Sequence, residues 1–291
     1  MIILDQKAEF MKKFTIPSIY KKIEDNEKIS FITAYDFPTS HFAKEAGIEM
    51  ILVGDSGGMC ILGKKTTLEV NMEEMLIMTE AVSKANNASF IVADMPFMSY
   101  QINDHDAVMN AGKFMRHNVD AVKLEGGGRV TDRVRAIVDA GIPVMGHLGL
   151  TPQSVSQMGG YRVQGKSVES VKNLMQDIEA LINAGVFSIL LEAIPNQVTE
   201  MITKNFDIAF FGIGAGIHVD GQLVISSDML GNFVGDIDPK FVKKYLNLKE
   251  SIIGAFQEYK KDIKNLSFPS NEHFYDIDKE SLEEILKFFN D

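Results

Sequence analysis

Five apolar, strand-like runs in this 291-residue chain end in side chains that can bind a metal or move a proton. The side chains are Asp55, Asp94, Lys123 with Glu125, His147 and Glu192. An unpaired charge is costly to bury, so charges at strand after strand indicate that these groups meet one another. In a parallel α/β barrel the carboxyl ends of all strands lie at one face, which is where such barrels place their chemistry.

The first two of these side chains are carboxylates at the ends of successive strand-like runs. Asp55 precedes Ser56-Gly57-Gly58, so its alternative role is that of an aspartate serving a turn. Two carboxylates at neighbouring strand ends suit Mg²⁺, a hard ion that takes oxygen ligands and leaves positions open for substrate. The pair therefore predicts a magnesium site.

The remaining polar strand ends supply a cation, a histidine and two more acids. Lys123 and Glu125 lie two apart in a strand and point to the same side, into the barrel or, alternatively, along a solvated edge as an ion pair. His147 at a strand end favours a substrate contact over a structural role. Glu192 closes a very apolar run, a setting that suits a general acid or base. The glycines at 126–128 form an open loop that could bind an anion.

The composition limits the partners and the compartment. The hydrophobic fraction of 45% and charged fraction of 24% are ordinary for a globular protein. A net charge of −11 argues against a nucleic-acid partner, which needs a basic face. Cys60 is the only cysteine, which favours a reducing, cytoplasmic location. No apolar run is long enough to cross a membrane, so we expect no membrane partner.

Strand-like and helical stretches alternate along the chain. We predict strands near 30–35, 50–54, 89–93, 120–124, 142–146, 187–191, 208–213 and 222–226. Apolar residues at helical spacing follow a capping box at Asn71 and Glu74, and a second such stretch begins at about Ala107. A third helical stretch ends at Gly185. Eight such units predict a closed (β/α)8 TIM barrel, with a doubly wound open sheet as the alternative.

The end of the chain differs from the rest in composition. We predict one barrel domain with an N-terminal lead-in over residues 1–275, followed by an acidic helical extension over 276–291. Ser281 and Glu284 form a capping box that should open the last helix. That helix could pack on the barrel or on a neighbouring subunit.

Several long segments closely resemble the ketopantoate hydroxymethyltransferase family. They occur in the family's order between about residue 15 and residue 275, and they cover 33–36, 53–59, 93–97, 122–127, 146–153, 159–165, 212–216, 220–222, 239–242 and 268–273. The resemblance implies a barrel of the phosphoenolpyruvate/pyruvate type. It also implies Mg²⁺, with 5,10-methylenetetrahydrofolate as cosubstrate, in pantothenate biosynthesis. Members usually assemble as large homo-oligomers, with a decamer expected.

The same resemblance implies a role for each strand-end residue. Asp55 and Asp94 would bind Mg²⁺, with Glu125 close to the metal or its waters. Ser56, Asp94 and Lys123 would hold the 2-oxo acid, 3-methyl-2-oxobutanoate, and His147 would contact it. Glu192 would remove the C3 proton. The resulting enolate, stabilised by Mg²⁺, would attack the one-carbon unit of the folate to give 2-dehydropantoate (ketopantoate).

Three positions depart from the family's usual residues: Glu69, Met78 and Ser227. We expect such departures near the pocket mouth, where they would bear on the 2-oxo acid used. Three rival functions stay open: a lyase or mutase of the same superfamily, a folate-independent aldolase, and a catalytically idle 2-oxo-acid-binding protein. The segment 146–153 favours hydroxymethyl transfer over the first, and the intact set of strand-end residues disfavours the last.

Overall fold

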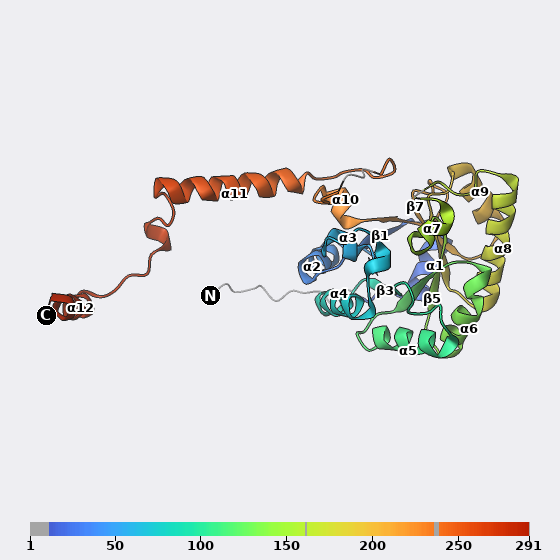
Figure 1. Cartoon of the computed structure of the whole chain (residues 1–291), viewed down its shortest axis with the longest axis horizontal. Coiled ribbons are helices and arrows are strands. Elements are labelled where there is room, and N and C mark those ends of the chain that lie inside the picture. The colour runs from blue at the N-terminus through green and yellow to red at the C-terminus, as the bar shows by residue number, and fades with distance from the viewer. Residues whose placement is uncertain (1–11, 161, 236–238, 291) are drawn as a thin grey trace.

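Eight parallel strands close into a barrel in which β8 pairs with β1 (Figure 1). This computed structural model describes residues 12–160, 162–235 and 239–290. The strands are β1 (Ile29–Thr33), β2 (Met50–Val53), β3 (Phe90–Asp94), β4 (Ala121–Glu125), β5 (Val144–Gly149), β6 (Ser188–Glu192), β7 (Ala209–Ile213) and β8 (Gly221–Val224). The predicted barrel is confirmed and the open sheet is excluded. The predicted fifth strand began too early, because Pro143 has no N–H to donate to a neighbouring strand.

Helices connect the first seven strands and form the outer layer. They are α2 (Phe37–Glu45), α3 (Gly57–Cys60), α4 (Met72–Ala85), α5 (Asp104–Met115), α6 (Thr131–Asp139), α7 (Val155–Met158), α8 (Val168–Ala184) and α9 (Asn196–Asn205). The predicted capping box is present at α4, where Asn71 and Glu74 bond each other's backbone N–H groups. Gly185 ends α8 with φ of +96°, which glycine adopts without steric cost.

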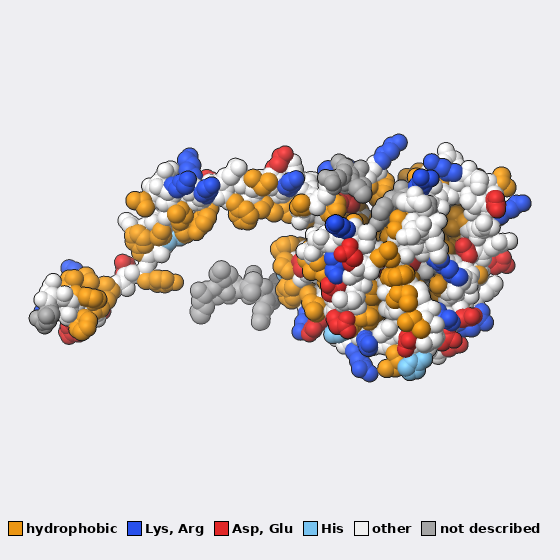
Figure 2. Space-filling model, in the orientation of Figure 1, with side chains coloured by type: hydrophobic (Ala, Val, Ile, Leu, Met, Phe, Trp, Pro, Cys, Tyr) orange, Lys and Arg blue, Asp and Glu red, His pale blue; other side chains and the backbone are white. Residues whose placement is uncertain are grey.

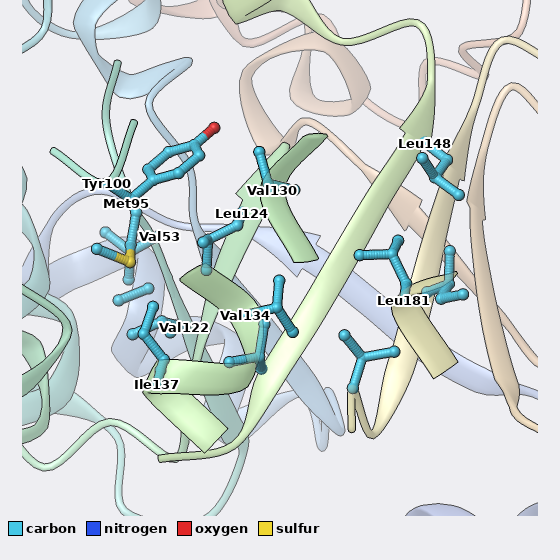
Figure 3. Packing of buried hydrophobic residues seen from close by; sticks show 14 of the residues in the cluster. Val53, Met95, Tyr100, Val122, Leu124, Val130, Val134, Ile137, Leu148 and Leu181 are labelled. Atoms are coloured by element: carbon cyan, nitrogen blue, oxygen red, sulfur yellow. The ribbon is translucent and has the colours of Figure 1, made fainter. Parts of the chain in front are cut away.

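Two layers of apolar side chains hold the barrel together. Inside it, Phe31 and Phe211 meet edge to face with ring centroids 5.5 Å apart, and α1 (Ile16–Glu24) adds Ile19 to this inner cluster. The outer cluster lies between strands and helices, where Val122 and Leu124 of β4 lie near Val134 and other residues of α6 (Figure 3). These layers leave the carboxyl ends of the strands to polar groups.

The strand–helix alternation stops at the end of the barrel, contrary to the sequence prediction. No helix separates β7 from β8, and β8 is followed only by the short α10 (Ser226–Leu230). The next helix, α11 (Leu248–Asn265), extends away from the barrel and has no buried residue (Figure 1). The outward-facing residues of β1 and β8 consequently stay partly exposed, whereas β2, β3 and β4 are buried throughout.

The last helix, α12 (Lys279–Asn290), lies at the far end of this extension and also has no buried residue. It begins two residues before the predicted start, because Asp278 accepts hydrogen bonds from the backbone N–H and hydroxyl of Ser281. The predicted capping box at Ser281 is therefore wrong. The division of the chain into a barrel domain and an extension at residue 275 stays a prediction. Residues 1–11, the start of the predicted N-terminal lead-in, lie outside the described part of the chain.

No helix in the described ranges is long and apolar enough to cross a membrane.

The inner cluster predicts a large stability effect for Phe211, which is fully buried. Phe211→Ala should lower the free energy of unfolding by about 3–5 kcal/mol, because it removes buried apolar surface and leaves a cavity. Met201→Ala, on the exposed side of α9, should change it by less than about 0.5 kcal/mol. Denaturant unfolding of both variants measures the difference, and equal effects would contradict the assigned core.

Candidate functional site

A cavity of about 1040 Å³ opens at the carboxyl ends of the strands. Every residue predicted from the sequence for the site lines it: Asp55, Ser56, Asp94, Lys123, Glu125, His147 and Glu192. They come from four strands, β3 to β6, and from the turn after β2. The structure thus brings the whole predicted set together, while the role of each residue stays a prediction.

Strand register makes Asp94 and Lys123 direct neighbours on β3 and β4. Lys123 Nζ lies 2.8 Å from Asp94 Oδ1 and 3.6 Å from Glu125 Oε1, and all three side chains are buried. Burial by itself lowers the pKa of Lys123, but the carboxylates of Asp94, Glu125 and Asp55 outweigh it and raise that pKa. Lys123 is therefore held as an ammonium that points into the cavity's polar end.

Glu125, His147 and Glu192 form a chain across β4, β5 and β6. Register places Glu125 beside His147, whose Nδ1 lies 3.3 Å from Glu125 Oε1 and 3.2 Å from Lys123 Nζ. The other ring nitrogen, Nε2, lies 3.1 Å from Glu192 Oε2. Glu192 is the most accessible member, with 16% of its side chain exposed. The imidazole thus links the charged end of the cavity to Glu192.

The protonation of His147 reflects opposing effects. Burial and the nearby Lys123 ammonium lower the pKa of His147, but the neighbouring Glu125 and Glu192 carboxylates, which favour the protonated ring, outweigh them and the pKa is raised. In the imidazolium both nitrogens carry protons, and in the neutral ring Lys123 donates to Nδ1 and leaves the proton on Nε2. Either way Nε2 carries a proton and lies 3.1 Å from Glu192 Oε2, a close contact without the geometry of a hydrogen bond.

Asp55 carries the most unfavourable negative charge of the cluster. Burial, followed by repulsion from Asp94 and Glu125, raises its pKa well above the usual range. Its backbone N–H donates to Asp94 Oδ2 at 3.2 Å, which holds the two carboxylates together. Ser56, the next residue, begins α3 and shares a 2.8 Å hydrogen bond with the Tyr35 hydroxyl. Three buried carboxylates and one ammonium leave an excess of negative charge.

The excess negative charge is carried by carboxylate oxygens, which are suitable ligands for a divalent cation. Among the described residues, no three His, Cys, Asp or Glu side chains stand as a complete metal centre. Mg²⁺ does not need one, because it is usually held by one or two carboxylates, water and substrate oxygens. Asp55 and Asp94 supply two carboxylates at adjacent strand ends, as the sequence predicted.

None of the three departures from the family pattern lines the cavity, so the expectation that they lie at its mouth is wrong. Glu69 accepts hydrogen bonds from backbone N–H groups of its own loop. Met78 is buried under α3, where a Cβ at Gly57 would lie 2.6 Å from its sulfur. Ser227 is buried in α10. Folding turned all three away from the cavity.

The glycine loop at 126–128 binds an anion of the protein itself. Gly128 N–H donates to Asp177 Oδ1 of α8 at 2.7 Å. A Cβ at Gly127 would collide with the Asp177 carboxyl group, so the glycine makes room for it. The open anion site considered from the sequence is thus occupied by a side chain.

Sequence reasoning missed two kinds of residue at the site. Gln153 and Tyr100 lie buried behind the carboxylates, and only Gln153 lay within a segment already singled out. Arg162, Lys240 and Phe241 line the cavity and are exposed. These last three lie in the segments 159–165 and 239–242, which the family resemblance had marked without giving any single residue a role.

Comparison with known sequences shows a family. The model of the family described as ketopantoate hydroxymethyltransferase matches residues 13–271. A protein of Alkaliphilus metalliredigens named 3-methyl-2-oxobutanoate hydroxymethyltransferase is 49% identical, with 96% of this chain and 99% of that one covered. A protein of the same name from Nitrosopumilus maritimus is 43% identical, with 93% and 97% covered.

Comparison with solved structures shows the fold. A phosphonopyruvate hydrolase, solved with oxalate and Mg²⁺, is similar with a TM-score of 0.58 at 11% identity, covering 95% of each chain. A 2,3-dimethylmalate lyase of the PEP mutase/isocitrate lyase superfamily has a TM-score of 0.59 at 15% identity, with 90% of this chain and 89% of that chain covered. At such low identity these likenesses concern the barrel alone.

The family model and the relatives cover nearly the whole chain. The chain belongs to the ketopantoate hydroxymethyltransferase family and is an enzyme, a transferase.

Proposed function

We propose that the protein transfers a hydroxymethyl group from 5,10-methylenetetrahydrofolate to 3-methyl-2-oxobutanoate and forms ketopantoate for pantothenate biosynthesis. The observation that carries this proposal is the division of the cavity into two ends. Asp55, Asp94 and Lys123 form a charged end. Glu192 lies toward Leu190 and Ile213, which line an apolar region. A branched 2-oxo acid has the same division, with two polar oxygens at one end and an isopropyl group at the other.

Asp55 and Asp94 would hold Mg²⁺, with Glu125 close to the ion or its waters. Bound there, the ion would act as a Lewis acid on the keto group and offset the excess negative charge. Ser56, Asp94 and Lys123 would hold the oxygens of the 2-oxo acid, and His147 would contact the substrate. The Lys123 ammonium, fixed by Asp94 at 2.8 Å, would stabilise negative charge that develops on the keto oxygen.

Glu192 would act as the general base. Its carboxylate takes the C3 proton, the C3–H electron pair moves toward the keto carbon, and an enolate forms. His147 Nε2, 3.1 Å from Glu192 Oε2, would help to place that carboxylate. Water replaces both C–N bonds of the folate methylene carbon, which is released as formaldehyde, and N5 and N10 of tetrahydrofolate take up the two protons of that water. The enolate carbon then bonds to the formaldehyde carbon, and the new alkoxide takes the C3 proton back from Glu192 to give ketopantoate.

The mouth of the cavity supports a folate as the second substrate. Arg162 and Lys240 add positive charge, and Phe233 and Phe241 add aromatic surface. A folate has an aromatic pterin and an anionic glutamate tail, so both features match. A net charge of −11 opposes a nucleic-acid partner, and the lone Cys60 supports a cytoplasmic location.

We also propose that the protein is a homo-oligomer, a decamer as in its family, held partly by α11 of one copy on the barrel of another. Ile252, Phe256, Tyr259 and Ile263 recur at spacings of four, three and four residues and are all exposed. They form one apolar side of the extended helix (Figure 2). A helix that follows β8 normally covers the outer face of β8 and β1, and here that face is partly exposed. The apolar side of α11 from a second copy would cover this partly exposed face of β8 and β1.

The reaction is tested by following deuterium exchange at C3 of 3-methyl-2-oxobutanoate by NMR, with Mg²⁺, before adding the folate. The wild type should exchange the proton and then form ketopantoate. Glu192→Gln should bind the acid but exchange at least about 100-fold more slowly, because it has lost its base. The exposed Glu200→Gln is the matched control. Undiminished exchange in Glu192→Gln removes Glu192 from the base role, and no exchange in the wild type removes the proposed substrate.

Metal binding is tested without turnover. At a concentration of Mg²⁺ about 100 times its dissociation constant, the wild type should gain about 2.7 kcal/mol of stability. Asp55→Asn should lose most of this gain, because one of the two proposed carboxylate ligands becomes neutral. Asp139→Asn, at the exposed end of α6, should keep it. Thermal unfolding with and without Mg²⁺ gives the result, and an equal gain in all three proteins contradicts the assigned site.

The role of α11 is tested by light scattering after size-exclusion chromatography. Phe256→Asp puts a charge into the apolar side, where Phe256 is 70% exposed, and should reduce the mass of the assembly. Lys261→Asp changes charge on the opposite side of the same helix, at an exposed residue, and should leave the mass unchanged. If both variants keep the wild-type mass, α11 does not hold the copies together.

A further inference from the structure

Gln153 is a buried residue that the reaction steps above do not use. It lies in the short 3-10 helix Pro152–Ser154 after β5 and is 5% exposed. Its side-chain Nε2 donates to Asp55 Oδ2 at 3.0 Å and to the carbonyl oxygen of Met95 at 3.0 Å. Its backbone N–H donates to Glu125 Oε2 at 2.9 Å. One residue therefore contacts groups at the ends of β2, β3 and β4.

The orientation of the Gln153 amide follows from its neighbours. Asp55 Oδ2 and the Met95 carbonyl accept hydrogen bonds, so both protons of Nε2 are used. The Tyr100 hydroxyl lies 2.8 Å from Gln153 Oε1 and also accepts the backbone N–H of Glu125 at 3.1 Å. The single proton of that hydroxyl has two acceptors, Gln153 Oε1 at 2.8 Å and the Glu125 carbonyl oxygen at 3.2 Å, and Oε1 is the nearer. A flipped amide would turn its oxygen toward Asp55 Oδ2 and the Met95 carbonyl and lose both of those bonds, so Gln153 is held in one orientation.

These bonds engage one oxygen of each of two carboxylates. Gln153 takes Oδ2 of Asp55 and Oε2 of Glu125, while Glu125 Oε1 faces Lys123 and His147 in the cavity. Asp94 is linked to this arrangement because its Oδ2 accepts a hydrogen bond from the backbone N–H of Asp55. The carboxylates that repel one another are thereby held at fixed positions before any ion binds.

We propose that Gln153, oriented by Tyr100, is a positioning residue that sets the geometry of the metal-binding carboxylates and so determines metal affinity. The inference rests on the proposed function, because it takes Asp55, Asp94 and Glu125 as the metal site. Mg²⁺ demands near-ideal octahedral geometry, so small displacements of a ligand oxygen matter. Loss of such supporting hydrogen bonds typically costs about 10–100-fold in metal affinity.

The test compares Mn²⁺ affinity, measured by EPR as free ion, in the full-length wild type, Gln153→Met and Tyr100→Phe. Gln153→Met keeps the volume but removes both side-chain donors, and should raise the Mn²⁺ dissociation constant about 10–100-fold. Tyr100→Phe should raise it less, because the amide loses only its orienting bond. Gln157→Met, which alters a neighbouring glutamine bonded to Arg129 at the surface, should leave it unchanged.

Two further readouts separate positioning from a general loss of structure. The double variant Gln153→Met/Tyr100→Phe should lose less Mn²⁺ affinity than the two single losses combined, since part of the Tyr100 effect passes through Gln153. Saturating metal should restore the turnover of Gln153→Met toward the wild-type value, whereas a damaged fold would stay inactive. If Gln153→Met does not fold, Tyr100→Phe still tests the proposal through its affinity.

The outcomes distinguish this inference from the proposed function. Wild-type affinity for Mn²⁺ in both Gln153→Met and Tyr100→Phe overturns the positioning role and leaves the metal site intact. A wild type that binds neither Mn²⁺ nor Mg²⁺ overturns the metal site itself, and the inference with it. Additive losses in the double variant also overturn the coupling between Tyr100 and Gln153.

Discussion

The buried Lys123 ammonium is the interaction on which the rest of the site depends. Asp94 lies 2.8 Å from Lys123 and Glu125 lies 3.6 Å from it, in a region closed to water by the barrel wall. Removing three carboxylates from water without a cation among them would cost several kcal/mol per charge. Lys123 offsets only part of this negative charge, and the remaining excess makes the cavity attractive to a divalent ion.

The barrel's register converts that local compensation into a working arrangement. Parallel pairing sets Asp94 against Lys123 and Glu125 against His147, so charged groups on adjacent strands meet without any loop to guide them. His147 then reaches Glu192 on the next strand. Strand ends are rigid because helices and strands pack around them, which is why a proton acceptor can be held at a constant distance from the charged end.

The outer helical layer of the barrel is incomplete beside β1 and β8, because α11 extends away from the barrel. The outer sides of β2, β3 and β4 are covered, but those of β1 and β8 are only partly so, and the apolar side of α11 is exposed in solvent. An exposed apolar stripe of this kind is unfavourable in an isolated subunit and marks an interaction surface. The incomplete wall is formed by the first and last strands, whereas the predicted site residues come from β3 to β6 and from the turn after β2.

Local periodicity and strand-end chemistry determined the fold class, the strand order and six of the polar residues that line the cavity, while Ser56 came from the family resemblance. Those features depend on short-range rules: apolar runs make strands, Asn71 or Gly185 mark helix ends, and charges at strand ends converge once the sheet closes. The residue types suggested a magnesium site, a substrate contact at His147 and an acid or base at Glu192, and the family resemblance supplied the specific substrate and the remaining roles. The tertiary structure alone decided which atoms became partners. Gln153 meets Asp55 from 98 positions away, and Asp177 fills the glycine loop from 49 positions away. It also decided that Met78 turns into the core and α11 away from it. Periodicity states which face of an element is apolar, but a hydrogen bond between distant segments depends on how the closed barrel places them, and no short-range pattern records that.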